Sequence, residues 1–287
     1  MMRLLIFLGF LLVLAPVYGA PKGKGAKPPA QHTDSSVFRF VAYGDTRSNP
    51  DAHRRIIARI MSLHPEFVLQ TGDLVADGRN SAQWDEFNAI KQPLKAAHIA
   101  YYPARGNHDA GRYYIKQVTE PYDSGNGYYY AFTRHHNRFI TVDNFEDFDA
   151  GSAQYKWLEV ELAKARTSAV NTFVLFHEGP FSVGPHGPTP ASVRYLHPLF
   201  VKYHPRIVFC GHDHLYYRTV RDGVQYVVTG GGGAELYSPV NSDLAILGDV
   251  YVKAHHVVLC EVDGSRVTVT AITDEGKVID KLTVGPK

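Results

Sequence analysis

The chain has 287 residues, of which 45% are hydrophobic and 20% are charged, and its formal net charge is +2. This composition excludes a disordered chain and a collagen-like repeat, and the two cysteines, Cys210 and Cys260, are too few for a disulfide framework or a cysteine-rich zinc site. Because 30 basic residues are balanced by 28 acidic ones, the charge gives no reason to expect nucleic acid or another polyanion as a partner.

The N-terminal residues are predicted to be a targeting segment and a tether. Arg3 precedes an apolar stretch over residues 4–17, and small residues follow it. A membrane span needs about 20 apolar residues, so we expect a cleaved secretory signal peptide over residues 1–19 and no stable membrane anchor. Residues 20–36 are rich in Pro, Gly and Lys and are predicted to be a flexible linker. A single domain is predicted over 37–287, in a secreted or periplasmic protein.

Five short apolar runs are predicted to be strands that are buried on both faces. Each run is β-branched or aromatic and nearly continuous, which is typical of such strands. The runs are Phe38–Tyr43, Phe67–Gln70, Ile99–Pro103, Phe173–Phe176 and Ile207–Cys210.

Helical patterns lie between these runs. Asn49-Pro50 is the order expected for an N-cap and a first helical residue. Ser81 opens a second helix, which Pro93 is expected to bend or end. Ser152 caps a third helix, and a fourth extends over residues 193–203.

After residue 211 the pattern changes to β-hairpins. The turns Arg221-Asp222-Gly223, Asp263-Gly264-Ser265 and Asp274-Glu275-Gly276 separate β-rich segments. The sequence therefore predicts a layered α/β domain whose C-terminal part is mostly antiparallel.

A polar cluster follows each of the five apolar runs. In α/β sheets, ligands bind beyond the carboxyl ends of the strands, and carboxylate, amide and imidazole donors without thiolate suit Mn, Fe or Zn. One such cluster alone is more often an ordinary turn, but five clusters at equivalent places favour one shared site. The clusters are Gly44-Asp45-Thr46-Arg47, Gly72-Asp73, Gly106-Asn107-His108-Asp109, His177-Glu178-Gly179 and Gly211-His212-Asp213-His214.

This series of motifs resembles the calcineurin-like metallophosphoesterases, a family that includes purple acid phosphatases and bacterial cyclic-nucleotide phosphodiesterases. The resemblance covers about residues 38–235, and its most specific motif is the terminal Gly-His-x-His. It implies an α/β fold with four layers in the order α/β/β/α, in which a β-sandwich is flanked by helices.

The resemblance also implies a dinuclear centre that holds two divalent or trivalent ions of Mn, Fe or Zn. Two such ions generate a hydroxide at neutral pH and stabilise both oxygens of an in-line displacement. His108 would be the general acid or the phosphate-contacting group, and Asp109 would orient it. The implied metal ligands are Asp73 as the bridge, Asp45 and His214 at the first position, and Asn107, His177 and His212 at the second.

One position departs from the family pattern. Most members have a histidine ligand two residues after the first aspartate, where this chain has Arg47, and a guanidinium has no free lone pair for a metal. Either Arg47 points inward and binds the substrate phosphate, which we favour, or it faces outward and the first site is weakened unless Asp77 or a water fills the gap. Purple acid phosphatases have a tyrosine at the position of Ala76, so the sequence disfavours that subclass.

The sequence therefore predicts a secreted hydrolase that cleaves small phosphate mono- or diesters with a metal-activated hydroxide. The alternative is a degenerate, non-catalytic module that binds metal or phosphate, and the retained His108 argues against it. His186, in the loop after His177, is a candidate for the rim of the site. His255-His256 lie away from the strand ends and are expected to be solvated. The natural substrate and the oligomeric state stay open.

Overall fold

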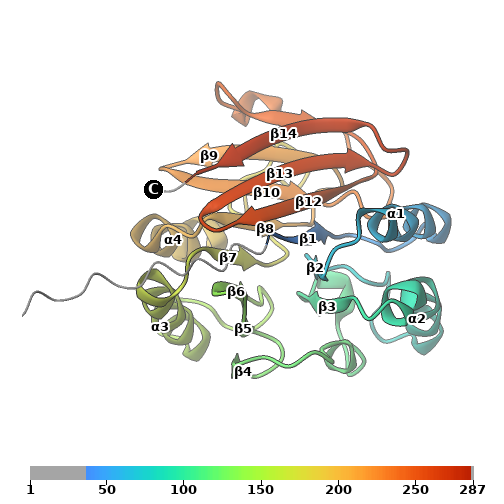
Figure 1. Ribbon diagram of the computed structural model, residues 1–287, viewed down its shortest axis with the longest axis horizontal. Coiled ribbons are helices and arrows are strands. Elements are labelled where there is room, and N and C mark those ends of the chain that lie inside the picture. Colours follow the sequence, from blue (N-terminus) through green and yellow to red (C-terminus); the bar gives the residue numbers. More distant parts are fainter. Residues whose placement is uncertain (1–36, 286–287) are drawn as a thin grey trace, which may run out of the picture. The chain divides into compact units, whose positions relative to one another are not determined.

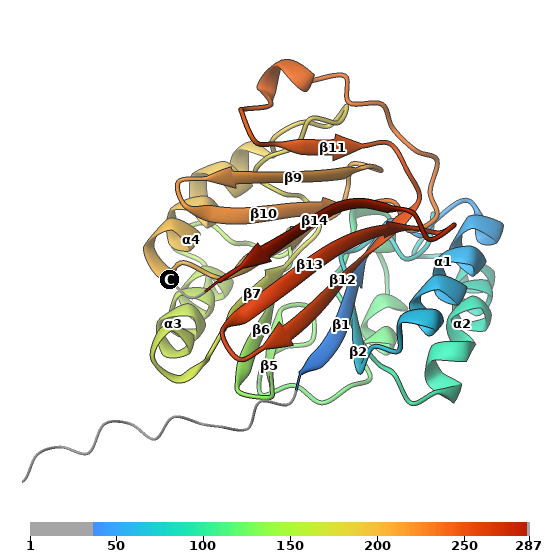
Figure 2. The same ribbon diagram turned by 45° about the horizontal axis from the view of Figure 1, so that its top comes forward.

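Two β-sheets stacked face to face form the body of residues 37–285, which are the residues that the computed structural model describes. Figures 1 and 2 show the sheets with helices on either side. The predicted signal peptide (1–19) and linker (20–36) lie outside the described residues. Between residues 37 and 285, no helix has both the length and the apolar character needed to cross a membrane.

The first sheet has six strands and is parallel in one half and antiparallel in the other. Its centre is β1, which pairs in parallel with β2 and antiparallel with β12. In spatial order the strands are β14 (Val278–Val284), β13 (Arg266–Thr273), β12 (His256–Asp263), β1 (Phe38–Tyr43), β2 (Phe67–Gln70) and β3 (Ala100–Pro103).

The second sheet has eight strands. Its middle strands β6, β7, β8 and β10 run parallel to one another, and antiparallel hairpins extend both edges. In spatial order the strands are β11 (Val250–Val252), β9 (Tyr216–Arg221), β10 (Val224–Thr229), β8 (Ile207–Cys210), β7 (Thr172–Leu175), β6 (Asn137–Thr141), β5 (Tyr130–Arg134) and β4 (Ser124–Gly125).

Helices cover the outer face of each sheet (Figure 1). Ile56 of α1 and Trp84 of α2 pack with Val68 of the first sheet, whereas Leu158 of α3 and Leu199 of α4 pack with the second. The helices are α1 (Pro50–Leu63), α2 (Ser81–Ala96), α3 (Ala153–Ser168) and α4 (His197–Tyr203), with short helical turns η1 (Asn107–Asp109), η2 (Tyr114–Gln117), η3 (Ser192–Leu196) and η4 (Ser242–Leu244).

Aromatic rings fill the space between the two sheets. Phe40 of β1 stacks on Phe67 of β2, with ring centroids 5.3 Å apart, and meets Phe173 of β7 edge to face at 5.1 Å. Such offset and edge-to-face pairs add about 0.5–1.5 kcal/mol each beyond the burial of their area. The α/β/β/α order of layers predicted from the sequence is confirmed.

All five apolar runs are strands, as predicted, but they are divided between the sheets: β1, β2 and β3 belong to the first, β7 and β8 to the second. Pro93 was expected to bend or end its helix. It does not end it, because α2 continues to Ala96. Pro93 deprives the carbonyl of Ala89 of its helical partner. Both residues are exposed, so water can solvate that carbonyl and the helix continues.

Candidate metal centre

The loops that follow β1, β2, β3, β7 and β8 converge on one place and bring the predicted site residues together. Backbone hydrogen bonds connect these loops: Asp45 N donates to Gly72 O at 2.9 Å, and Gly211 N donates to His177 O at 3.0 Å. The backbone N–H of His108 donates to Asp73 Oδ1 at 3.0 Å. Strand ends from both sheets therefore supply a single site.

Three of the site residues have a left-handed backbone. The φ angles are 59° at Asp45, 56° at Asp73 and 72° at His212. This conformation costs a residue other than glycine about 1–2 kcal/mol, and such strain concentrates where function requires it. Here the turn directs each side chain into the site at the point where its strand ends.

Four side chains meet at what we call the second position, after the numbering of the two expected ions. The ring of His177 directs Nδ1 to the carbonyl of Thr71 at 2.9 Å, so Nδ1 carries the hydrogen and Nε2 presents a lone pair. That Nε2 lies 3.0 Å from Asn107 Oδ1, 3.2 Å from His212 Nδ1 and 3.5 Å from Asp73 Oδ1.

These separations fit a bound cation. Around an ion with bonds of about 2.0–2.2 Å, neighbouring ligand atoms lie about 3–3.5 Å apart. With the hydrogen of a neutral His177 on Nδ1, His177 Nε2 and Asn107 Oδ1 are two acceptors 3.0 Å apart. A cation between them would be bound by both.

The first position has a donor set of its own. One atom from each of Asp45, Asp73 and His214 lies within 4.8 Å of the other two, and all three residues are buried. His214 donates from Nδ1 to the carbonyl of Glu235 at 2.6 Å, which leaves Nε2 as an acceptor. Asp77, considered from the sequence as a further ligand, is exposed and accepts the backbone N–H of Arg79 instead.

Arg47 points into this first position. Its Nε donates to Asp73 Oδ2 at 3.0 Å, and its Nη2 lies 3.4 Å from His214 Nε2. The interpretation that Arg47 faces outward is therefore wrong. The favoured interpretation, an arginine that points inward to bind phosphate, is right about the direction, but the guanidinium contacts two expected metal ligands.

Burial keeps two of the expected histidine ligands neutral, as a metal requires, but it opposes the ionised form of Asp45. It lowers the pKa of His212 to about 3 and that of His214 to about 4, so both imidazoles are neutral at neutral pH and available as ligands. Burial, together with the charge of Asp73, raises the pKa of Asp45 well above its usual range. Burial acts on Asp73 in the same direction, but the charges of His177 and His108 in their protonated forms, the backbone N–H of His108 and the charge of Arg47 outweigh it and lower the pKa.

His108 lies at the edge of the donor set. Its Nδ1 is 2.8 Å from the carbonyl of Ala76 and donates to it, so Nε2 is free to face a substrate, 4.0 Å from Asp73 Oδ2. The expectation that Asp109 orients this ring is wrong. The Asp109 carboxylate accepts backbone N–H groups of Leu74, Val75 and Gly106 instead, because it lies beneath the loop, fully buried.

Three further side chains border the site. The ring of His186, predicted as a rim candidate, lies 3.9 Å from the ring of His212, and Tyr237 stacks on His214 at 4.0 Å. Asp213 accepts the backbone N–H of His186 at 3.1 Å and the Ser182 hydroxyl. Asp213 belongs to the Gly-His-Asp-His motif that the sequence analysis identified. Tyr237 belongs to no such motif, so the sequence did not predict that it borders the site.

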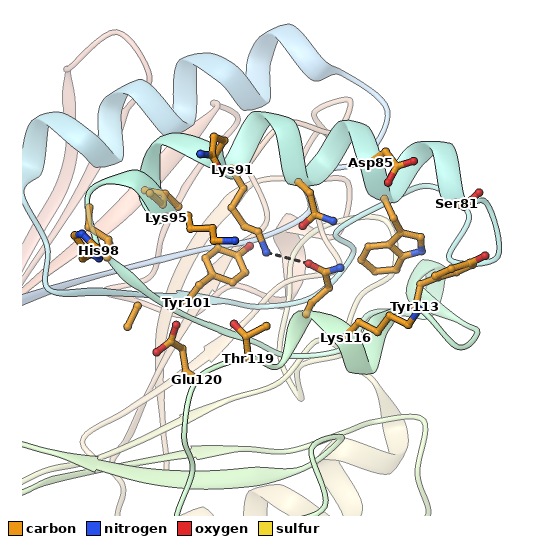
Figure 3. A pocket seen from close by; sticks show the side chains of 17 residues that line it. Ser81, Asp85, Lys91, Lys95, His98, Tyr101, Tyr113, Lys116, Thr119 and Glu120 are labelled. Carbon is orange, nitrogen blue, oxygen red and sulfur yellow. Dashed lines mark hydrogen bonds between the residues drawn. The ribbon is translucent and has the colours of Figure 1, made fainter.

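A cavity of about 760 Å³ lies elsewhere, between α2 and the segment around η2 (Figure 3). Lys91 donates to Gln117 Oε1 at 2.9 Å across it and lies over the rings of Phe87 and Tyr101, at 4.9 and 4.6 Å from their centroids. The described residues that line this cavity include none of the predicted ligands.

Comparison with known proteins agrees with this geometry. The model of the calcineurin-like phosphoesterase family matches residues 38–216, and the chain belongs to that family. Tartrate-resistant acid phosphatase type 5 of Oryctolagus cuniculus is 25% identical, over 94% of this chain and 95% of its own length. Probable purple acid phosphatase 20 of Arabidopsis thaliana is 28% identical, over 68% of this chain and 52% of the plant protein.

Solved structures show the same fold. Purple acid phosphatase PPD1 from yellow lupin (Lupinus luteus) seeds superposes with a TM-score of 0.76 at 22% identity, over 88% of this chain and 54% of the lupin chain. This chain thus spans about half of that enzyme. GAP50, described as the anchor in the inner membrane complex of Plasmodium, superposes with a TM-score of 0.65 at 16% identity, over 88% of this chain and 89% of the other.

The prediction of a metallophosphoesterase, a hydrolase of phosphate ester bonds, is thus confirmed at the level of the family. The expectation that disfavoured purple acid phosphatases rested on Ala76 alone, and it is not supported, because relatives of that subclass are among the most similar proteins.

Proposed function

We propose that this protein is a secreted, metal-dependent phosphatase that hydrolyses small phosphate esters, with monoesters as the preferred class. The observation that supports it most is the second position, where ring nitrogens of His177 and His212 and the amide oxygen of Asn107 converge beside the carboxylate of Asp73. The preference for monoesters follows from the acid phosphatases among its relatives; diesters are the alternative to be tested.

The donor set suits a borderline or hard cation. One carboxylate, one amide oxygen and two imidazoles, without thiolate, favour Mn, Fe or Zn. When bound, such an ion supplies Lewis acidity that neutralises charge on the phosphate and lowers the pKa of a bound water. The dinuclear centre that the family resemblance implies requires a second ion on Asp45, Asp73 and His214, where Arg47 already contacts two of the three.

The chain's own residues supply orientation and a proton. His108 donates from Nδ1 to Ala76 O, which fixes the ring and directs Nε2 toward the substrate side. With about a third of its side chain exposed (32%), His108 can deliver the Nε2 proton to the oxygen of a leaving alcohol and regain one from solvent. Arg47, beside Asp73, keeps a positive charge next to the place where the phosphate binds.

Secretion is the part of the proposal that rests on sequence alone. Residues 1–19 have the basic start, short apolar stretch and small-residue end of a signal peptide. Expression of the full chain in a secreting host, followed by N-terminal sequencing of the exported protein, tests it. The expected first residue is Ala20, and a product that stays in the cell with its N-terminus intact would contradict the proposal.

The activity is tested with a matched pair of substrates, an aryl phosphate monoester and the corresponding diester, on the purified metal-loaded protein. We expect turnover of both, with the larger kcat/KM for the monoester. His212→Ala should abolish it, because this change removes one ligand of the second position. Bound metal with no turnover of either substrate would instead support the non-catalytic module.

A further inference from the structure

We propose that the guanidinium of Arg47 takes the place of the first metal ion, so that the protein binds one ion, at the second position, instead of two. The inference rests on the proposed function, since it assumes that the second position binds a metal.

Each of the three expected ligands of the first position already accepts a hydrogen bond. Arg47 Nε lies 3.0 Å from Asp73 Oδ2, and Arg47 Nη2 lies 3.4 Å from the Nε2 acceptor of His214. The third ligand, Asp45, accepts the backbone N–H of His212 with both carboxylate oxygens, at 3.1 Å each. An ion here would have to displace the guanidinium from two of its three ligands.

The second position differs in this respect. There the neighbours of His177 Nε2 are Asn107 Oδ1 at 3.0 Å and His212 Nδ1 at 3.2 Å, and neither is a guanidinium. The two positions therefore differ in that a cationic side chain already contacts the ligands of the first.

The backbone holds Arg47 in this place. Thr46 N donates to Asp73 O at 3.0 Å, and Thr46 Oγ1 donates to Leu74 O at 2.9 Å. Two hydrogen bonds therefore join the residue before Arg47 to the loop that carries Asp73. The neighbouring Ser48 has a φ of 75°, which turns the chain away again. Arg47 is therefore directed at Asp73 by its own loop.

Charge and burial favour the same arrangement. The side chain of Arg47 is 17% exposed and that of Asp73 is 1% exposed, so solvent screens their attraction only weakly. A permanent positive charge at this distance from the carboxylate does part of what an ion would do there, and it repels a second cation.

The test is the number of ions bound per chain, measured by elemental analysis after chelation, reloading with Mn²⁺ and desalting. We expect one ion in the wild-type protein and two in Arg47→His, which introduces a ligand, and in Arg47→Ala, which removes the competing charge. Arg105→Gln is the matched control, because Arg105 is a half-buried arginine of a neighbouring loop that pairs with Asp143; it should stay at one.

Two ions in the wild-type protein would overturn the inference and leave the proposed function intact. No bound ion would contradict the proposed function itself. If the wild-type protein and both Arg47 variants hold one ion, Arg47 is not the reason that the first position is empty, and the inference is wrong. If Arg47→His does not fold, Arg47→Ala and the wild-type count still decide.

Two substitutions locate the ion. Asp45→Asn should keep the single ion, since Asp45 belongs to the first position only, whereas His212→Ala should lose it. The reverse pattern would overturn the inference. The electron paramagnetic resonance spectrum of the Mn²⁺ form gives an independent readout, because an isolated ion and an exchange-coupled pair have different spectra. We expect the isolated-ion spectrum in the wild-type protein, and a coupled spectrum would count against the inference.

Discussion

The backbone N–H of His212 donates to both carboxylate oxygens of Asp45, at 3.1 Å each. These residues are 167 positions apart in the chain and follow strands of different sheets, β1 and β8. The hydrogen bonds therefore join the two halves of the sandwich at the edge where the ligands meet. Since His212 also has a left-handed φ of 72°, this contact helps to hold a strained residue in place.

Asp73 is the residue whose removal should damage the site most. Asp73→Asn keeps the shape of the side chain but removes its charge, and we expect loss of most bound metal and a fall in kcat/KM of roughly 100-fold or more. Elemental analysis and steady-state kinetics on the same preparation check this. Asp77→Asn, an exposed aspartate of the same loop, is the control; an Asp73→Asn protein that equals it in metal and rate would disprove the assignment.

His108 should act as a proton donor, which makes its effect depend on the leaving group. His108→Ala should retain metal and lose roughly 10²–10⁴-fold in kcat on an alkyl phosphate. The loss should be much smaller on nitrophenyl phosphate, whose leaving group scarcely needs a proton. Equal losses on the two substrates would indicate that His108 binds phosphate instead.

Asp109 should contribute to stability through the loop. It is fully buried and accepts three backbone N–H groups, those of Leu74, Val75 and Gly106. Asp109→Ala leaves these donors without a partner, and each such group costs about 1–3 kcal/mol. We expect a loss of about 3 kcal/mol or more in the free energy of unfolding, measured with urea. Unchanged stability together with a lower kcat would restore the orienting role that the sequence suggested.

Local patterns predicted what depends on neighbours in the chain. The continuous apolar runs predicted the strands correctly, because a strand that is buried on both faces needs such a run, and the polar clusters behind the runs lie close together in the structure. Contacts between distant segments were not predictable in this way. His256 was expected to be solvated, but β12 lies between β1 and β13 and the side chain is fully buried.

The same limit applies inside the site. The sequence identified Asp109 and Arg47 as site residues but not what they contact. The partners of Asp109 are backbone groups of its own loop and of the loop that follows β2. The direction of Arg47 follows from the hydrogen bonds of Thr46 to the loop that carries Asp73. Neither the sequence motif nor the residue types carry that information.

Buried histidines should make the fold sensitive to acid. Burial, with smaller effects of Lys91 and Arg54, lowers the pKa of His53 to about 3, whereas an unfolded histidine titrates near pH 6.5. Between these values the unfolded chain binds a proton that the folded chain excludes, so stability is full above about pH 6.5 and falls as the pH decreases.

His53 alone should account for about 2 kcal/mol of the stability lost between pH 7.5 and 5. His53→Phe keeps a ring beside Phe87, whose centroid is 5.6 Å from that of His53, and removes the titration. Urea unfolding of both proteins across this range should give a shallower pH dependence for the variant, whatever its absolute stability. Parallel curves would show that His53 is not excluded from protonation in the folded state.

Hydrolysis of a phosphate ester should depend on an ion held by Asp73, Asn107, His177 and His212. The most direct measurement is the rate of nitrophenyl phosphate hydrolysis by the purified protein as its metal is removed by a chelator and then returned. We expect a fall of roughly 100-fold or more, recovery when metal is restored, and no recovery in the His212→Ala protein. A rate that stays constant while elemental analysis shows the metal to be gone would contradict it.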